Sequence, residues 1–201
     1  MSPTATPPVA ARDVPDTVSA RDKLVAAAAE LLGEVGPRAT SVRMVADRAG
    51  VNHGLVHHYF SSKDGLLRAA MESLVDAHET WAREQSAGSP IPAPLALLGD
   101  RGYLAAVVRC VLDDEMDLAR TELDRGVSVP RATLDHLVAR RGGTPDARTK
   151  ALVALGMAME MGWAALEPFL FAVTDTSDDE ATAVRDEARR LRTTFMESVT
   201  R

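Results

Sequence analysis

Residues 36–67 constrain the fold of this 201-residue chain more than any other stretch, because they have the pattern of two short helices joined by a glycine turn. The first helix is expected over residues 41–49, where one apolar face recurs at helical spacing through Val42, Val45, Ala46 and Ala49. Gly50 follows at a position where a helix ends in the left-handed conformation, which glycine adopts without steric cost. The second helix is expected over residues 52–58. Two helices around a tight turn can present a short rod to the major groove of DNA.

The second expected helix has an apolar inner side and a polar outer side. Val56 faces inward and two aromatic residues follow it, whereas the outer positions are Asn52, His53, Gly54 and His57. Residues 36–68 carry five basic and two acidic side chains, a net charge of +3, so the rest of the chain carries −9 of the total of −6. An acidic body with one basic end would orient the protein on a polyanion.

The composition indicates a soluble, all-α protein. Apolar residues make up 46% and charged residues 26%, aromatic residues only 4%, and no run of β-branched residues alternates as a strand would. The single cysteine, Cys110, excludes an internal disulfide, fits a cytoplasmic location, and is expected to be inert core. No stretch approaches the ~20 apolar residues that span a bilayer. Residues 1–17 also lack the basic start and apolar centre of a signal peptide.

We predict three parts along the chain. A disordered arm covers residues 1–15, a three-helix, helix-turn-helix DNA-binding domain covers residues 16–62, and a larger helical ligand-binding and dimerisation domain covers residues 63–201. The first helix is expected to begin near Ser19, with Asp22 in a capping-box-like position, and the fourth to use Ser61 and Asp64 in the same way. Later helices are expected at residues 63–81, 103–112, 129–141, 146–173 and 180–199, with a linker over 84–94 and a polar stretch over 113–126.

The last two expected helices indicate a dimer. The helix over residues 146–173 is apolar on most sides and must therefore be buried on most sides. Together with residues 180–199 it predicts a four-helix interface with a second copy, formed by Leu152, Leu155, Met159, Leu166, Val184, Leu191 and Phe195. Glu160 and Glu167 lie on the same helix and need partners if they are buried, so one is expected to face a cavity or the other subunit.

The segment TSVRMVADRAGVNHGLVHHYFSSKDGLL, residues 40–67, resembles the TetR (tetracycline-repressor) family of transcriptional regulators, whose pattern is T-x-x-x-I-A-x-x-A-G-V-S-x-G-x-x-Y-x-H-F-x-x-K-x-x-L. The resemblance covers residues 19–75, and the remainder is similar only in its helical character and length. Asn52 stands where the family often has serine, and His57 and His58 stand where a tyrosine pair is usual. Gly65 replaces a better helix former, at a cost of ~1 kcal/mol relative to alanine.

The resemblance implies a repressor that leaves its DNA operator when a small, apolar effector enters the larger domain. By position it implies base contacts from Val42, Arg43, His53, Gly54, Leu55 and His57. It implies phosphate contacts from Thr40, His58, Tyr59 and Lys63. The guanidinium of Arg43 suits guanine or phosphate, and Leu55 suits a thymine methyl group. The candidates for the effector pocket are Trp81, Met116, Met157, Met161, Trp163 and Phe169.

Simpler interpretations of these residues remain open. Arg43 can be a solvated helix charge, and the methionine and aromatic residues can be core or interface. His53 and His57 have the spacing of a metal-ligand pair, but no accompanying cysteine or glutamate completes a known arrangement, so we expect no metal. The acidic cluster that begins at Asp113 is expected to be a solvated loop. Without a nucleophile–base pair or phosphate loop we expect neither an enzyme nor a cofactor; the alternative function is a helical adaptor that binds protein.

Overall fold

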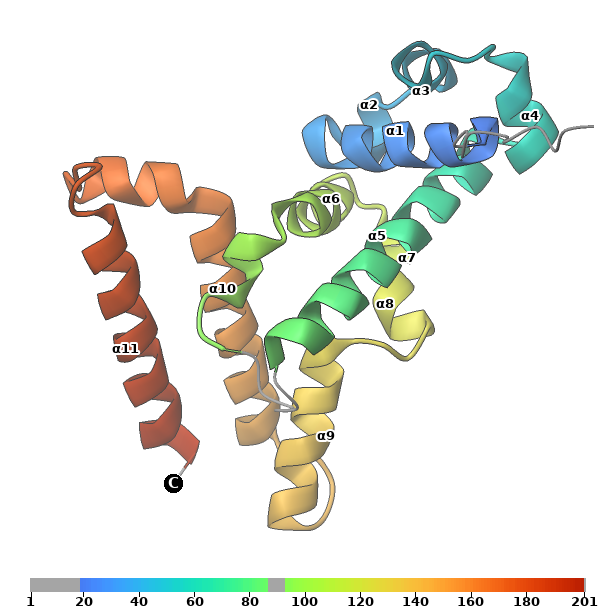
Figure 1. Cartoon of the computed structure of the whole chain (residues 1–201). Helices are drawn as coiled ribbons and strands as arrows, with labels where there is room; N and C mark the ends of the chain where they lie inside the picture. Colours follow the sequence, from blue (N-terminus) through green and yellow to red (C-terminus); the bar gives the residue numbers. More distant parts are fainter. Residues whose placement is uncertain (1–18, 87–92, 201) are drawn as a thin grey trace, which may run out of the picture.

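The computed structural model describes residues 19–86 and 93–200, and every regular element in them is helical, which confirms the predicted all-α fold. The N-terminal unit contains α1 (Ala20–Glu34), α2 (Gly36–Ala39), α3 (Val42–Ala49) and α4 (Gly54–Phe60). The long helix α5 (Lys63–Ser86) leads from this unit into the larger domain (Figure 1). The predicted arm over residues 1–15 lies outside the described residues.

The larger domain is built from a 3₁₀ turn and six further helices in the described part of the chain. They are η1 (Ala96–Gly99), α6 (Arg101–Leu112), α7 (Met116–Ala119), α8 (Thr121–Asp124), α9 (Val129–Arg141), α10 (Ala147–Val173) and α11 (Ala181–Thr200). In Figure 1, α6 lies beneath α1, and α10 and α11 form a hairpin on the opposite side of the molecule from α4. Within the described residues, no helix combines the length and apolar character required to cross a membrane.

Side-chain caps fix several helix starts, as the sequence predicts for the first of them. The hydroxyl of Ser19 accepts a hydrogen bond from the Asp22 N–H at 3.1 Å, and the hydroxyl of Ser41 accepts one from the Met44 N–H at 3.2 Å. At α10 the carboxylate of Asp146 accepts from the Thr149 N–H at 2.7 Å. Each cap satisfies a backbone donor that the first helical turn leaves unpaired.

The start of α4 differs from the prediction. The helix begins at Gly54 rather than at residue 52, because the side-chain oxygen of Asn52 accepts from the Gly54 N–H at 2.8 Å. Asn52 and His53 therefore form a cap turn in front of the helix.

The start of α5 also corrects the prediction. Ser62, not Ser61, caps the helix, since its hydroxyl accepts from the Gly65 N–H at 3.0 Å, while Ser61 has a positive φ of 64°. A β-carbon at Gly65 would clash with the Phe60 carbonyl oxygen. The glycine that looked costly within the helix is thus required by the close approach of α4 to α5.

Two further boundaries differ from the prediction. Helix α5 continues to Ser86, into the expected linker, and the expected polar stretch over residues 113–126 contains the one-turn helices α7 and α8. On α5 the buried positions after Met71 are Val75 and His78.

A single hydrophobic core joins the N-terminal unit to the larger domain. Leu24 and Leu32 of α1 lie in the same buried cluster as Met71 of α5 and as Ala106 and Cys110 of α6. Burial raises the pKa of the Cys110 thiol to about 11, so this cysteine stays protonated at neutral pH and is core, as expected. The position of the N-terminal unit therefore depends directly on α6.

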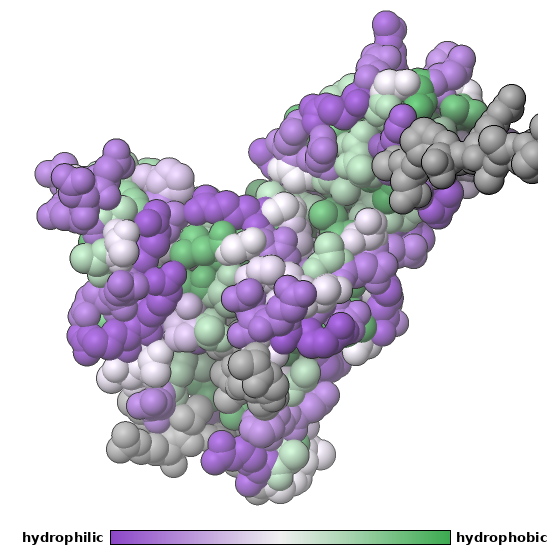
Figure 2. Space-filling model, in the orientation of Figure 1, coloured by the Kyte–Doolittle hydropathy of each residue, from purple (hydrophilic) through white to green (hydrophobic). Residues whose placement is uncertain are grey.

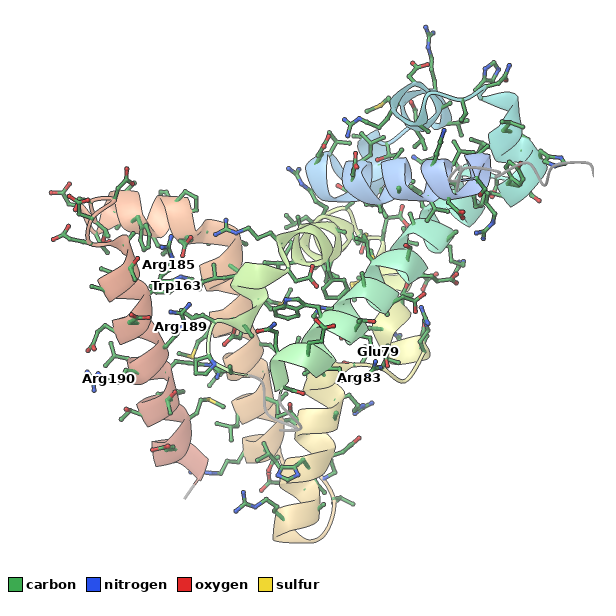
Figure 3. All side chains as sticks on the ribbon, viewed as in Figure 1. Glu79, Arg83, Trp163, Arg185, Arg189 and Arg190 are labelled. Atoms are coloured by element: carbon green, nitrogen blue, oxygen red, sulfur yellow. The ribbon has the colours of Figure 1, made fainter. Side chains whose placement is uncertain are left out.

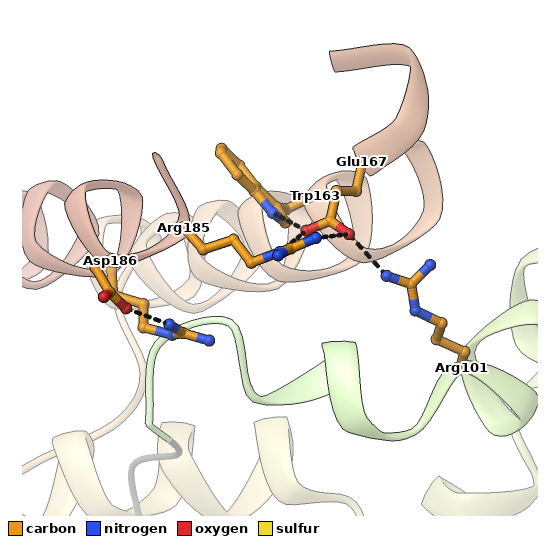
Figure 4. Close-up of polar contacts among 6 residues, drawn as sticks. Arg101, Trp163, Glu167, Arg185 and Asp186 are labelled. Atoms are coloured by element: carbon orange, nitrogen blue, oxygen red, sulfur yellow. Dashed lines mark hydrogen bonds and ion pairs between the residues drawn. The ribbon is translucent and has the colours of Figure 1, made fainter. Parts of the chain in front are cut away.

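Glu167 ties the start of α6 to the α10–α11 hairpin. Its carboxylate accepts hydrogen bonds from Arg101 of α6 at 2.8 Å and from Arg185 of α11 at 2.8 and 3.1 Å (Figure 4). Trp163 donates to the same carboxylate from one turn away on α10, at 3.2 Å. The adjacent Pro168 lacks a backbone N–H, and α10 turns near its C-terminal end in Figure 1.

The substitution Glu167→Gln tests this junction. The Arg185 guanidinium holds the pKa of Glu167 at about 2, below its ordinary value of 4.5, so the ionised carboxylate stabilises the fold above pH 4.5 and this stabilisation is lost as the pH falls toward 2. We expect E167Q to lower the free energy of unfolding at pH 7 by roughly 2 kcal/mol, less than the full shift implies because both arginines are partly exposed.

Urea unfolding followed by circular dichroism, at neutral pH and at about pH 4, measures this effect. The difference between wild type and E167Q should shrink at the lower pH. The matched control is Glu187→Gln, which removes a carboxylate from an exposed ion pair with Arg190 on α11 and should change stability little. An E167Q effect that is independent of pH would contradict the assignment.

Candidate nucleic-acid interface and ligand cavity

The turn between α3 and α4 is fixed by Gly50. Its φ of 65° and ψ of 34° are left-handed, and the N–H of Val51 reaches back to the Ala46 carbonyl at 3.1 Å. Val45 and Val56 are fully buried, one from each helix, so the inner sides of both helices pack into the core. The opposite sides of α3 and α4 consequently face solvent at the outer end of the N-terminal unit.

The predicted base-contact residues divide into two groups in the structure. Arg43, His53, Gly54 and His57 are exposed, and the Arg43 side chain is 90% exposed with Asp47 at 3.7 Å. This outer end is mostly hydrophilic in the space-filling view, at the upper right of Figure 2. Val42 and Leu55, in contrast, are half-buried and pack against the core.

The predicted phosphate-contact residues require one correction. Thr40 is buried, and its hydroxyl donates to the Gly36 carbonyl at 2.7 Å, so it is not free to donate to a phosphate. His58 and Tyr59 are exposed, with their rings edge to face at 4.8 Å. Lys63 is half-buried and its ammonium group lies 3.5 Å from the Arg38 carbonyl oxygen, at the end of α2.

The sequence analysis missed two exposed side chains at this end, Arg38 and Met44. Met44 follows Arg43 on the outer side of α3, and its helical position is the signal that could have identified it. Arg48 is basic but does not belong to the interface. Its guanidinium binds Glu30 at 3.0 Å and Glu34 at 2.9 and 3.0 Å, which clamps α3 to α1.

The larger domain contains a partly open cavity of about 580 Å³. Its walls come from α5 and η1 through α11, and four predicted residues line it: Trp81, Met116, Met157 and Met161. The other two predictions are corrected. Trp163 lies against Arg185 in the Glu167 junction, as Figure 3 shows, and Phe169 is 64% exposed on α10. Lining residues that the sequence analysis missed include His78, Tyr103, Glu122 and Arg192.

An aromatic stack forms one wall of this cavity. The rings of His78 and Tyr103 stack at 4.0 Å with an interplanar angle of 15°, and the Trp81 ring lies 5.9 Å from His78. Asp100 holds the other side of His78, with its carboxylate 2.8 Å from Nδ1. Burial, and then the nearby carboxylate of Glu122, raise the pKa of Tyr103, so its hydroxyl remains a hydrogen-bond donor.

The α10–α11 hairpin presents an apolar face to solvent in the single chain. Its exposed members at helical spacing on α10 are Leu155, Met159, Leu166, Phe169 and Val173, and Leu191 and Phe195 are exposed on α11. Two predicted interface residues lie differently. Leu152 is buried within the chain, so it belongs to the core, and Val184 is half-buried. Hydrophobic surface is visible over the upper part of α10 in Figure 2.

Together, α1, α3, α4 and the left-handed glycine define a helix-turn-helix domain. Residues 24–70 match the sequence model described as bacterial regulatory proteins, tetR family. Over this segment the chain is similar to the TetR family.

The chain is also similar to individual transcriptional regulators. Over 94 residues the chain is 35% identical to the HTH-type transcriptional regulator BetI of Pseudomonas paraeruginosa, a match that covers 47% of this chain and 45% of that protein, so the chain spans just under half the length of this relative. It is 28% identical over 172 residues to the HTH-type transcriptional repressor Rv3405c of Mycobacterium tuberculosis, covering 84% and 86%. A tetR-family regulator from Streptomyces coelicolor has the same fold, with a TM-score of 0.54 at 16% identity over 90% of this chain and 86% of that one.

The substitution Gly50→Ala tests the turn. No atom lies within 4 Å of the position that a β-carbon would take there, so only the left-handed backbone conformation opposes alanine, at about 1 kcal/mol. Gly102 is the matched control, because it also has open space around it but lies within α6 without a positive φ. Thermal unfolding should show that G50A is destabilised and that G102A is unchanged or stabilised. Equal effects would contradict this account of the turn.

Proposed function

We propose that this protein is a dimeric transcriptional repressor that binds an operator through α3 and α4 and leaves it when a small molecule enters the cavity. The observation that carries the proposal is the exposure of Arg43, His53 and His57 around Gly50 while the inner sides of the same helices are buried. An α-helix held in this way fits the major groove, where arginine pairs with guanine or phosphate. The repressor name of the Mycobacterium tuberculosis relative supports the sense of regulation.

The apolar face on α10 and α11 supports a dimer. A two-fold axis beside this hairpin would pair it with the same face of a second copy, which buries Leu166 and Phe169 away from water. Two copies carry two recognition helices, which must lie about 34 Å apart to enter successive major grooves on one side of the duplex. Dimerisation through the apolar face would therefore bring two recognition helices to one DNA site.

The contacts of helix α6 support coupling between the cavity and the DNA-binding helices α3 and α4. Tyr103 and Val107 of α6 line the cavity, and Asp113 directly after it accepts a hydrogen bond from the Arg38 N–H of α2 at 3.0 Å. At Gly33 of α1, a β-carbon would lie 3.4 Å from the Gly102 carbonyl oxygen, so α1 and α6 approach closely. A ligand that displaces α6 changes the position of the N-terminal unit, and linkage then lowers the affinity for DNA.

The substitution Arg43→Ala tests DNA binding. We expect it to weaken binding to the DNA upstream of the protein's own gene by about tenfold, and to reduce the slope of log affinity against log salt by about 1. Fluorescence anisotropy over a range of salt concentrations measures both quantities.

Arg189→Ala is the matched control, since it removes the same charge from α11 (Figure 3), where Arg189 pairs with Asp186 at 2.7 Å. Equal losses in both variants, or no binding of the wild type at low salt, would contradict the proposal. Affinity for a protein partner that does not depend on salt would instead indicate a helical adaptor.

The substitution Leu166→Asp tests the dimer. Placing a carboxylate in the middle of the apolar face should weaken self-association by about a hundredfold or more. Leu112→Asp is the matched control, because Leu112 is 75% exposed at the end of α6, away from this face. Sedimentation equilibrium should find L166D monomeric at concentrations where wild type and L112D are dimeric. A dimeric L166D would contradict the proposed interface.

A further inference from the structure

The polar groups of the cavity indicate what chemistry its ligand has. Most of the wall is apolar, formed by methionine, valine, leucine and alanine side chains beside the aromatic stack. Three carboxylates interrupt it, Glu79 from α5, Glu122 from α8 and Glu160 from α10. A polar group in such a wall either has a partner in the protein or is available to a ligand.

Glu160 retains an unused acceptor. The residue is 7% exposed; its Oε1 accepts from the Leu95 N–H at 2.7 Å, while its buried Oε2 has no hydrogen-bond partner. Arg192 lies close, with Nε 3.0 Å from Oε1, but the two groups are not aligned for a hydrogen bond. Burial raises the pKa of Glu160, and the Leu95 N–H, Arg192 and the backbone N–H groups of Leu97 and Ala96 offset this only in part. A buried carboxylate oxygen without a donor is costly, and a donor on a ligand would remove that cost.

Glu122 adds a charge without a counter-ion. Its carboxylate accepts from the Tyr103 hydroxyl at 2.5 Å and from the Ser128 hydroxyl at 2.8 Å, and both donors are neutral. No lysine, arginine or histidine among the described residues forms an ion pair with it. Glu122 therefore holds a negative charge at the cavity wall that the protein solvates but does not neutralise.

The cations of the wall are already paired. Arg83 binds Glu79 at 2.6 Å, Arg120 lies 3.8 Å from Asp124, and Arg192 faces Glu160. The described wall carries three carboxylates and three guanidinium groups, but Arg120 pairs with Asp124 outside the wall, so Glu122 is the carboxylate left without a counter-ion. An anionic ligand would have to displace an existing ion pair, whereas a cation would complete an incomplete one.

We propose that the cavity binds an organic amine: an apolar molecule with a protonated nitrogen whose N–H donates to Oε2 of Glu160. The hydrocarbon part lies among Met157, Met161 and the aromatic stack, whose ring faces also attract a cation. The inference rests on the proposed function only in taking this cavity as the effector site. Amine recognition itself requires no DNA.

Three molecules of the same shape test the charge preference: 4-phenylbutylamine, 4-phenylbutanol and 4-phenylbutyrate. Titration calorimetry on the full chain without DNA, together with the fluorescence of Trp81, gives their affinities. We expect the amine to bind about tenfold more tightly than the alcohol, because a charge-assisted hydrogen bond replaces a neutral one, and the acid to bind most weakly. Equal affinities, tightest binding of the acid, or no measurable amine binding up to its solubility limit would overturn the proposal.

Glu160→Gln tests the residue. Glutamine keeps an oxygen for the Leu95 N–H but removes the charge, so the preference for the amine over the alcohol should fall to about twofold or less. Glu79→Gln is the matched control on the same wall, because its carboxylate is already bound by Arg83, and it should retain the preference. Glu122→Gln provides a second variant that should weaken amine binding if E160Q does not fold. Retention of the full preference in both E160Q and E122Q would overturn the assignment.

The operator-binding and amine-binding experiments test the two proposals independently. Amine selectivity without operator binding would refute the proposed repressor and leave the amine site standing. Operator binding with a cavity that prefers neutral or anionic probes would refute the amine site and leave the repressor standing.

Discussion

The close packing of α1 on α6 is the constraint on which the rest of the structure depends. Glycine and alanine occupy the contact, at Gly33, Ala105 and Ala106, so the two helices approach without large side chains between them. This contact makes one core out of the N-terminal unit and the larger domain. Small residues leave little room for compensating side-chain rotation, and dense packing transmits displacement rather than absorbing it. The orientation of α3 and α4 is therefore set by where α6 lies.

Electrostatic groups hold the two ends of α6 in different ways. At its start Arg101 reaches a buried carboxylate of α10, and at its end Asp113 binds a backbone N–H of α2. The first contact depends on the ionisation of Glu167, and the second is a single hydrogen bond at an exposed position. The polar anchor of α6 to the hairpin is thus an ion pair and its polar anchor to α2 is a single hydrogen bond, while its middle forms a wall of the cavity.

The sequence predicted the helices well and the polar partners poorly. Local signals were sufficient for Gly50, the Ser19 cap and the bounds of α9, because each depends on neighbours in the chain. Apart from Trp163, the partners of Glu160 and Glu167 come from α11 and from residues near η1, more than 15 positions away, and no periodic pattern carries that information. Thr40 and Trp163 were assigned to the wrong environments although their hydrogen-bond partners, Gly36 and Glu167, lie only four positions away, because the burial of each side chain depends on how other helices pack against it. The spacing of residues along a helix shows which side is exposed only when the side that packs against the core is already known.

Cys110 has a consequence for following this molecule in motion. It is the one thiol of the chain, has no exposed surface, and lies in the buried cluster that α6 shares with α1 and α5. Since its sulfur is protonated and shielded while this cluster stays packed, alkylation requires the cluster to open. The rate at which a thiol reagent modifies the protein therefore measures how often this buried cluster opens.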